Sequence, residues 1–267
     1  MSDVSNSPPP GRHESQEEEE NLAEGTLISH LIELRSRLIK ATLGVVVVFA
    51  CMVPFTQDIF TIVSKPLTDL LPKGSKMIVT GIAAPFLTPF KTTMFIALFL
   101  AMPVVLYQMW RFVAPGLYRR EKRFAIPLLV SSILLFYAGV AFAYFVVFRL
   151  AFAFFISHTP QNVVNMPDID AYLGFVLKIF FAFGLGFELP IGIVILVWSG
   201  VTTVAAMAKA RPYVFLGAFV VGMLMTPPDM ISQTLLALPM YALFESGLIL
   251  ARVMLPERQK EQSAEEA

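Results

Sequence analysis

Apolar residues along this chain gather into long runs instead of alternating with polar ones. Four runs, at residues 38–55, 92–113, 125–148 and 172–199, have about the 20 residues that an α-helix needs to cross a bilayer. Two more runs, at residues 213–225 and 234–250, are shorter and flank a Thr-Pro-Pro-Asp turn. The pattern predicts an all-α polytopic membrane protein with six transmembrane helices, of which the fifth and sixth are short.

The two ends of the chain differ in composition from the middle. Residues 1–25 contain Ser, Asn, Pro and an unbroken acidic run, Glu17 to Glu20, so we expect a disordered acidic tail. Residues 26–252 form the predicted six-span domain, and residues 253–267 a charged cytoplasmic tail. With the N-terminus inside, 14 of the 20 Lys and Arg residues fall on inner segments, and Lys178 counts among the outer ones. The positive-inside rule therefore predicts that both termini are cytoplasmic.

Two segments outside the spans show helical periodicity. Between spans one and two, apolar residues recur at helical spacing at Ile59, Phe60, Val63 and Leu67. This predicts a structured outer cap, in which we expect Pro66 to have a structural role. Leucines at positions 27, 31, 34 and 38 predict an amphipathic helix that lies along the inner surface and runs into span one.

Composition excludes several classes of protein. Hydrophobic residues make up 56% of the chain and charged residues 15%, against about 45–50% and about 25% in soluble domains. The 20 basic and 20 acidic residues cancel, so nothing favours nucleic-acid binding. The single cysteine, Cys51, and three histidines show no metal-ligand spacing, and HExxH, GxSxG and P-loop motifs are absent. We expect no cofactor, no metal site and no enzymatic activity.

Glu188 is the most informative polar residue of the spans, because a charge at the centre of a membrane helix costs about 2.5–3.5 kcal/mol. It should face a polar concavity or be protonated; the simpler alternative is a structural hydrogen bond to another span. The nearby Pro190 frees a backbone carbonyl and adds polarity there.

Further polar groups near membrane depth are Gln233 and Glu245 in the sixth span, and Thr226 and Asp229 on the outer turn. Asp229 is equally well placed to cap the sixth helix. Met223 and Leu224 form an apolar lateral surface, suited either to ordinary packing or to docking of a partner helix.

Two acidic residues lie within basic inner stretches. Glu33 is spaced for an ordinary i,i+4 ion pair with Arg37. Glu121 would simply balance the charge of the neighbouring cations in a solvated loop. Alternatively, Glu121 is held for a cationic guest that replaces resident Arg side chains.

Three stretches resemble the TatC family of membrane subunits of the twin-arginine protein translocase: HLIELR at residues 30–35, FVAPGLYRREKR at 112–123 and FVVGMLMTPPDMISQTLLALPMY at 219–241. The resemblance covers about residues 26–252. It implies a signal-peptide receptor of the bacterial inner membrane that works in a multimeric complex with TatA/TatB-type single-span subunits and uses the proton-motive force.

The resemblance also implies roles for individual residues. Glu33 and Glu121 would meet the arginine pair of the signal peptide, with Arg35 and Gln108 at the same site. Met223 and Leu224 would dock a partner helix.

Two other functions compete with this interpretation. A proton-coupled secondary transporter would use Glu188 and Glu245, but such transporters are commonly built from repeats, and none is visible. An intramembrane enzyme would need a nucleophile and a base, or paired aspartates, at membrane depth, and the spans contain neither arrangement.

Overall fold

The computed structural model describes residues 12–70, 77–113, 122–158, 166–226 and 229–255. Within these ranges the chain is almost entirely helical and forms no strand beyond one isolated bridge. Five helical segments are long and apolar enough to cross a membrane: Leu31–Lys65, Ala84–Phe112, Ile126–Phe155, Ile169–Trp198 and Met230–Met254. Arg211–Met225 is a shorter apolar helix. The predicted class, an all-α polytopic membrane protein, is confirmed.

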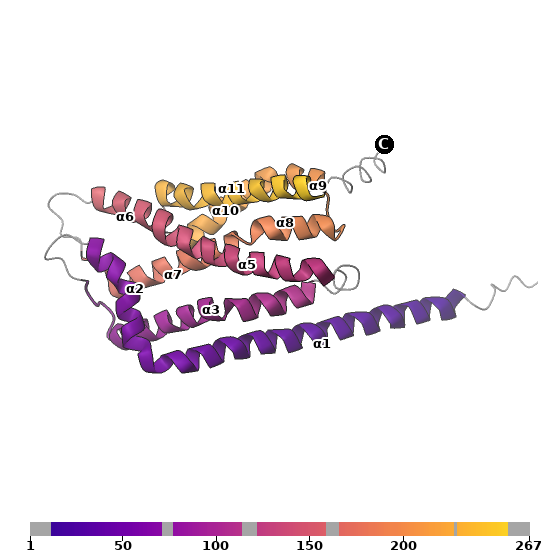
Figure 1. Cartoon of the computed structure of the whole chain (residues 1–267), viewed down its shortest axis with the longest axis horizontal. Helices are drawn as coiled ribbons and strands as arrows, with labels where there is room; N and C mark the ends of the chain where they lie inside the picture. Colours follow the sequence, from indigo (N-terminus) through magenta and orange to yellow (C-terminus); the bar gives the residue numbers. More distant parts are fainter. Residues whose placement is uncertain (1–11, 71–76, 114–121, 159–165, 227–228, 256–267) are drawn as a thin grey trace, which may run out of the picture.

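Most of the helices run along one long axis, and α2 crosses that axis at one end (Figure 1). In chain order they are α1 (Arg12–Met52), the 3₁₀ turn η1 (Val53–Phe55), α2 (Thr56–Leu70), α3 (Ala84–Val113), α5 (Lys122–Phe142), the π-helical turn η2 (Ala143–Val147), α6 (Phe148–Ser157), α7 (Ile169–Gly186), α8 (Leu189–Trp198), α9 (Val204–Lys209), α10 (Arg211–Met225) and α11 (Met230–Met254).

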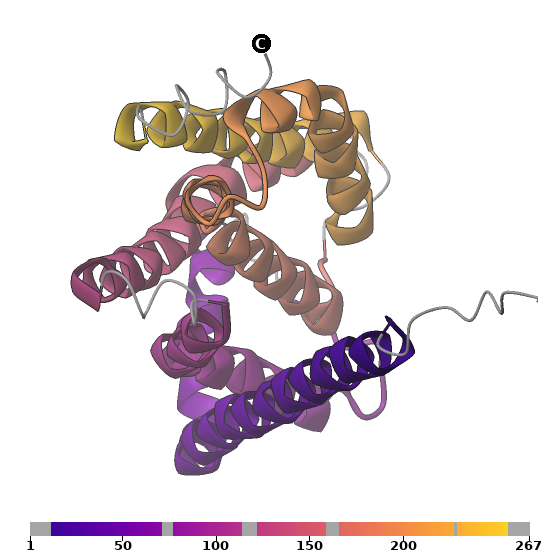
Figure 2. The same ribbon diagram turned by 90° about the vertical axis from the view of Figure 1, so that its right-hand side faces the viewer.

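The start of α1 and the end of α11 lie at the same end of the bundle, which we call the terminal end; α2 lies at the opposite, cap end (Figure 1). Viewed from the terminal end, α1 lies on one side of the bundle and α10 and α11 on the other (Figure 2).

Helix α1 differs from the expectation at its start. It is one continuous helix from Arg12, so it begins inside the segment predicted to be disordered, and the expected surface helix at residues 27–38 is simply part of it. No proline interrupts Arg12–Met52, and Glu, Leu, Arg and Ala are good helix formers, so a helix started by the apolar span can extend backwards. Residues 1–11 and 256–267 of the predicted tails lie outside the described residues.

The prediction of two short final helices is half right. Helix α10 has 15 residues and is about 22 Å long, as expected. Helix α11 has 25 residues, which is enough to span a bilayer, so the prediction of a short sixth helix was wrong. Pro239 and Glu245 made it look broken, but a transmembrane helix tolerates Pro where neighbouring groups satisfy the freed carbonyl.

At the cap end, α2 confirms that the segment after span one is structured, and it contains Pro66. The segment before α3 is joined to the start of α7 through Asp168. Its Oδ1 accepts hydrogen bonds from the backbone N–H groups of Asp170 and Ala171, and its Oδ2 accepts them from the N–H (2.9 Å) and hydroxyl (2.7 Å) of Thr80. The backbone bond from Ala171, followed by the Thr80 hydroxyl, lowers the pKa of Asp168 to about 2.

The core of the bundle forms where α5 packs on α7. The fully buried rings of Phe136 and Phe183 lie at its centre. Gly139 allows this packing, because a Cβ atom there would overlap the backbone carbonyl of Phe183. The two helices therefore approach closely, which brings the terminal-end half of α5 next to the joint between α7 and α8.

Candidate functional site

Glu188 lies at a joint inside the fourth span and not within a continuous helix. Helix α7 ends at Gly186 and α8 begins at Leu189, so Glu188 occupies the turn between them. Pro190, at the start of α8, has no N–H to continue the hydrogen bonding of α7, which accounts for the break.

A hydrogen-bonded chain from two other helices reaches Glu188. The hydroxyl of Ser132 on α5 donates to Glu188 Oε2 at 2.6 Å, and Trp110 Nε1 on α3 donates to Ser132 Oγ at 2.9 Å. Because the indole N–H can only donate, Ser132 must accept from Trp110 and direct its own proton to the carboxyl group. The predicted hydrogen bond from Glu188 to another span is therefore present.

One oxygen of this carboxyl group is left over. Glu188 Oε1 is buried and has no hydrogen-bond partner among the described residues. Ser132 is fully buried. The geometry thus fixes one carboxyl oxygen between three helices and leaves the other available to a donor.

Glu245 has a different environment and does not join Glu188. Arg211, the first residue of α10, holds it through two parallel bonds, Nε–Oε1 at 2.7 Å and Nη2–Oε2 at 2.8 Å. The hydroxyl of Tyr241 adds a third bond to Oε1 at 2.9 Å. The arrangement is a bidentate ion pair that ties α10 to α11.

The polar side chains around the α10–α11 turn bond to backbone groups of these two helices. Gln233 Nε2 donates to the carbonyl of Phe219 at 2.7 Å, and its side chain packs over Gly222. The buried hydroxyl of Thr226 donates to the carbonyl of Gly222 at 2.8 Å. Asp229 caps α11 by accepting a backbone N–H bond at 2.7 Å, which is the simpler of its two interpretations.

At the terminal end, the structure places Glu33 and Arg35 on α1 and Gln108 near the end of α3. Glu33 accepts a bond from Arg37 Nε at 3.1 Å, so the i,i+4 ion pair is present, while Arg35 is exposed and Gln108 half-buried. Glu121 lies outside the described residues.

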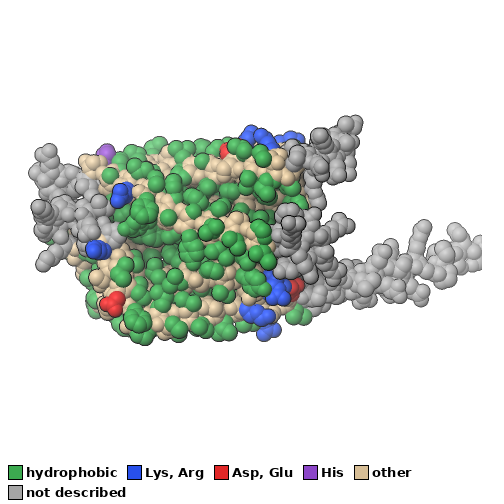
Figure 3. Space-filling view, in the orientation of Figure 1, with side chains coloured by type: hydrophobic (Ala, Val, Ile, Leu, Met, Phe, Trp, Pro, Cys, Tyr) green, Lys and Arg blue, Asp and Glu red, His purple; other side chains and the backbone are tan. Residues whose placement is uncertain are grey.

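Helix register shows where Glu33 lies relative to the inner loop. Gly44 of α1 lies against Val104 of α3, with 3.1 Å between an added Cβ and Cγ1. Glu33 is 11 residues from Gly44, about 16 Å, and Val113 is nine from Val104, about 14 Å. Glu33 is therefore about level with Val113, the last residue of α3. Lys and Arg side chains gather at this end, beyond a broad hydrophobic belt (Figure 3).

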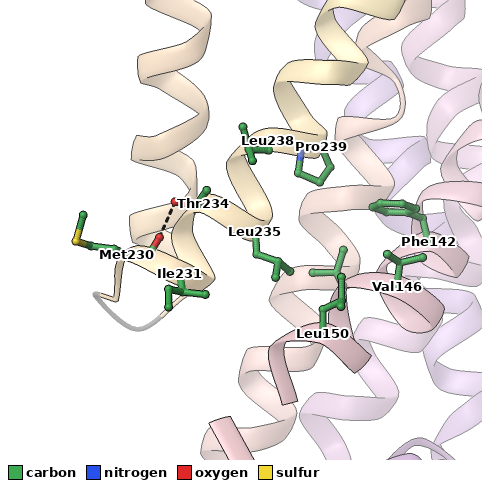
Figure 4. A pocket seen from close by; sticks show the side chains of 10 residues that line it. Phe142, Val146, Leu150, Met230, Ile231, Thr234, Leu235, Leu238 and Pro239 are labelled. Carbon is green, nitrogen blue, oxygen red and sulfur yellow. Dashed lines mark hydrogen bonds between the residues drawn. The ribbon is translucent and has the colours of Figure 1, made fainter. Parts of the chain in front are cut away.

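Two lateral surfaces are apolar. Met223 and Leu224, on the last turn of α10, are 54% and 67% exposed. A groove of about 490 Å³ lies between the α5–η2–α6 stretch and the first half of α11 (Figure 4). Its only hydroxyl, on Thr234, is already bonded to the carbonyl of Met230 at 2.6 Å. Without charged or free polar groups, this groove provides no chemistry for recognising a specific ligand.

Sequence reasoning missed Trp110 and Ser132 in the hydrogen-bonded chain to Glu188, and Arg211 as the partner of Glu245. The available signals were weak: one of only two Trp residues, a Ser pair within an apolar run, and an Arg at the start of a short helix. Over the described ranges, no group of three or more His, Cys, Asp and Glu residues is arranged to hold a metal ion.

Comparison with known proteins agrees with this architecture. The family model described as Sec-independent protein translocase protein (TatC) matches residues 29–239. The Sec-independent protein translocase protein TatC of Azotobacter chroococcum mcd 1 is 58% identical over 222 residues, covering 83% of this chain and 87% of that protein. The TatC of Escherichia coli K12 is 56% identical over 226 residues, covering 85% and 88%.

A solved structure has the same fold. The crystal structure of a twin arginine translocase receptor, TatC, superposes with a TM-score of 0.78 at 37% identity, covering 84% of this chain and 98% of that one. The family match covers most of the spans described above and includes Glu33, Glu188 and Gln233. This chain therefore belongs to the TatC family of Sec-independent protein translocase proteins.

Proposed function

We propose that this chain is the signal-peptide receptor and core subunit of a twin-arginine protein translocase. It binds the Arg-Arg motif of folded precursors on the cytoplasmic face of a bacterial inner membrane and assembles with single-span partner subunits for export. The observation that carries the proposal is the similarity, in sequence and in fold, to a protein described as a twin arginine translocase receptor. The role is that of a receptor without covalent chemistry.

The orientation of the bundle supports a cytoplasmic terminal end. Both described chain ends lie there (Figure 1), and on the face shown in Figure 3 more Lys and Arg side chains lie at this end than at the cap end. With residues 26–252 as the translocase domain, the tails at 1–25 and 253–267 extend into the cytoplasm. The positive-inside rule favours this orientation over the reverse.

The receptor chemistry rests on carboxylate and guanidinium geometry. An Arg guanidinium presents a planar set of donors that pairs with both oxygens of a carboxylate, whereas the Lys ammonium cannot. Glu33 and Glu121 can therefore read two arginines, with Arg35 and Gln108 beside them. Arg37 now holds Glu33 through a partly exposed i,i+4 pair. Such a pair is worth only about 0.3–0.5 kcal/mol, so an incoming Arg can replace it.

The surface proposed to bind a partner helix lies on the last turn of α10, at the end of this helix away from Arg211. Met223 and Leu224 are exposed there and suit the apolar side of a TatA/TatB-type transmembrane helix. Gln233 and Thr226 supply the nearby polar groups. Such partners, recruited in a multimeric complex and driven by the proton-motive force, would complete the export machinery.

Proton-coupled transport is not favoured as an alternative. A carrier of that kind would need Glu188 and Glu245 along one path. Glu245 instead forms two parallel bonds with Arg211 of α10. Glu188 accepts its hydrogen bond from Ser132 of α5 and does not contact Glu245.

The test is binding of an Arg-Arg signal peptide to the full chain in detergent. We expect Glu33→Gln and Glu121→Gln each to weaken binding about 10- to 150-fold, because each loses a charged hydrogen bond worth about 1.5–3 kcal/mol. Asp58→Asn is the matched control, since Asp58 is an exposed carboxylate on α2 at the cap end. A Lys-Lys peptide should bind weakly even to the wild type.

Unchanged binding in both Gln variants would remove the receptor role from these two residues. Equal binding of the Arg-Arg and Lys-Lys peptides would show that general charge attraction, and not carboxylate geometry, holds the signal.

A further inference from the structure

A second groove opens on the cap-end half of the bundle, and we call it the cap-end groove. It has a volume of about 520 Å³ and lies between the first turns of α3 and α7 and the last turn of α10. Unlike the apolar groove beside α11, it contains charged side chains: Lys91 on α3, and Asp170 and Lys178 on α7.

Two of these three charged residues, Lys91 and Asp170, form an ion pair. Lys91 Nζ lies 3.0 and 3.2 Å from the two carboxylate oxygens of Asp170. The hydroxyl of Thr88 also donates to Asp170 Oδ1, at 2.9 Å. Asp170 is thus fully engaged by α3 and is not available to a cation deeper in the groove.

Lys178 is the deeper cation. It lies eight residues beyond Asp170, about 12 Å further along α7 and inside the membrane-spanning segment Ile169–Trp198. Its side chain is exposed on the groove, and no described residue forms a hydrogen bond or ion pair with it. A cation at this depth is unfavourable unless water or an anion reaches it.

The wall around Lys178 is open to a neighbouring helix. Gly174 lies one helical turn before Lys178 in α7 and also lines the groove. A Cβ atom at Gly174 would meet no other atom within 4 Å. Small residues of this kind let transmembrane helices approach closely. Leu224, 67% exposed on the last turn of α10, forms the apolar opposite wall.

From this arrangement we infer that the cap-end groove receives a partner's transmembrane helix that carries a carboxylate near its middle, and that Lys178 pairs with that carboxylate. A lipid phosphate has the same charge but remains at headgroup level, whereas a helix can carry a carboxylate to the depth of Lys178. The inference rests on the proposed function in that it names the recognition group for a partner helix of the translocase. Lys178 then selects acidic helices over neutral ones.

The test uses the full chain in nanodiscs of zwitterionic lipid at pH 8. The probe is a labelled synthetic 20-residue Leu/Ala helix with Glu at its centre, with matched helices that carry Gln or Lys there. Binding is followed by energy transfer to a fluorophore on the chain. The variants are Lys178→Met, Lys178→Glu, and Arg149→Met, a matched control that removes an exposed cation from α6 outside this groove.

We expect the wild type and Arg149→Met to bind the Glu helix about tenfold more tightly than the Gln helix. Lys178→Met should bind both alike, and Lys178→Glu should prefer the Lys helix. Equal binding of the Glu and Gln helices to the wild type, or a Glu preference that survives in Lys178→Met, would overturn the inference. So would a result in which Lys178→Met loses only bound anionic phospholipid, measured by native mass spectrometry in phosphatidylglycerol nanodiscs.

Signal-peptide binding measured on the same preparations separates the two proposals. The Lys178 variants should bind the Arg-Arg peptide as the wild type does, because their change lies at the cap end. Loss of the Glu-helix preference with normal signal binding would leave the receptor proposal intact. A Glu-helix preference that depends on Lys178, together with signal-peptide binding that does not depend on Glu33 or Glu121, would support the groove proposal and contradict the proposed receptor site.

Discussion

Replacing Ser132 by Ala should destabilise the bundle far more than the loss of one hydroxyl from a helix normally does. Ser132 is fully buried, accepts a bond from Trp110 at 2.9 Å and donates one to Glu188 at 2.6 Å. Alanine cannot do either. The substitution therefore leaves an indole N–H without its acceptor, and it leaves Glu188 without a donor on the oxygen that had one.

Two estimates bracket the cost. Hydrogen bonds between membrane helices average about 0.6 kcal/mol each, so losing two costs at least about 1.2 kcal/mol. Buried groups left without partners cost about 1–3 kcal/mol each, which gives an upper limit of about 6 kcal/mol for two. The second effect should dominate, because Glu188 Oε1 already has no partner among the described residues and cannot compensate. We expect a loss of about 2–4 kcal/mol in the free energy of unfolding.

The measurement is reversible unfolding of the purified chain in mixed micelles, with Ser131→Ala as the matched control. Ser131 is the adjacent residue, and its hydroxyl donates only to the carbonyl of Leu128 in its own helix, at 2.9 Å. That variant should cost less than about 1 kcal/mol. Equal losses in the two variants would refute the reasoning, since they would show that the chain from Trp110 to Glu188 contributes nothing beyond an ordinary helix hydroxyl.

Three further predictions follow from other contacts. The pKa of Asp168 is lowered to about 2, so its carboxylate should stabilise the fold above about pH 4, and this contribution should disappear as the pH falls from about 4 to 2. Unfolding free energies measured from pH 2 to 5 should show that Asp168→Asn removes this dependence; an unchanged pH profile would contradict it. Arg211→Met should lower the free energy of unfolding, because it leaves Glu245 with only its bond from the Tyr241 hydroxyl, and adding Glu245→Met should recover part of that loss in a double-mutant cycle; strictly additive costs would argue against the pair. Gly139→Ala should cost about 1–3 kcal/mol because its Cβ would overlap the backbone of α7, whereas Gly217→Ala, which meets nothing within 4 Å, should be neutral or slightly stabilising in the same unfolding assay.

The spans were predictable because the bilayer imposes a strong pattern on the sequence. Runs of apolar residues located every long helix, and the periodicity around Phe60 and Val63 located α2. The errors fell where a local signal was outweighed by its surroundings. Pro239 and Glu245 suggested a short sixth helix, yet α11 runs from Met230 to Met254, partly because Arg211 neutralises Glu245.

Partners distant in sequence were beyond prediction. Glu188 stood out from its depth alone, but its donor Ser132 lies 56 residues earlier, and nothing in the local sequence links them. Lys178 was counted with the outer segments although it lies near the outer end of the predicted run at 172–199; α7 begins at Ile169, so Lys178 is nine residues inside the helix. The depth of a residue depends on where its helix begins, which apolar runs locate only to within a few residues.

Helix α3 connects the parts of the bundle to which we assign a role. Its cap-end turn holds Asp170 of α7 through Lys91, and its middle packs against α1 at Val104. Near its terminal end, Trp110 holds Ser132 and, through it, the carboxyl group of Glu188. Trp110 is only three residues from Val113, where α3 ends and the segment with Glu121 begins. If the signal peptide binds at this end, as proposed, the nearest described turn of α3 is the one that carries Trp110 and, through Ser132, the hydrogen bond to Glu188.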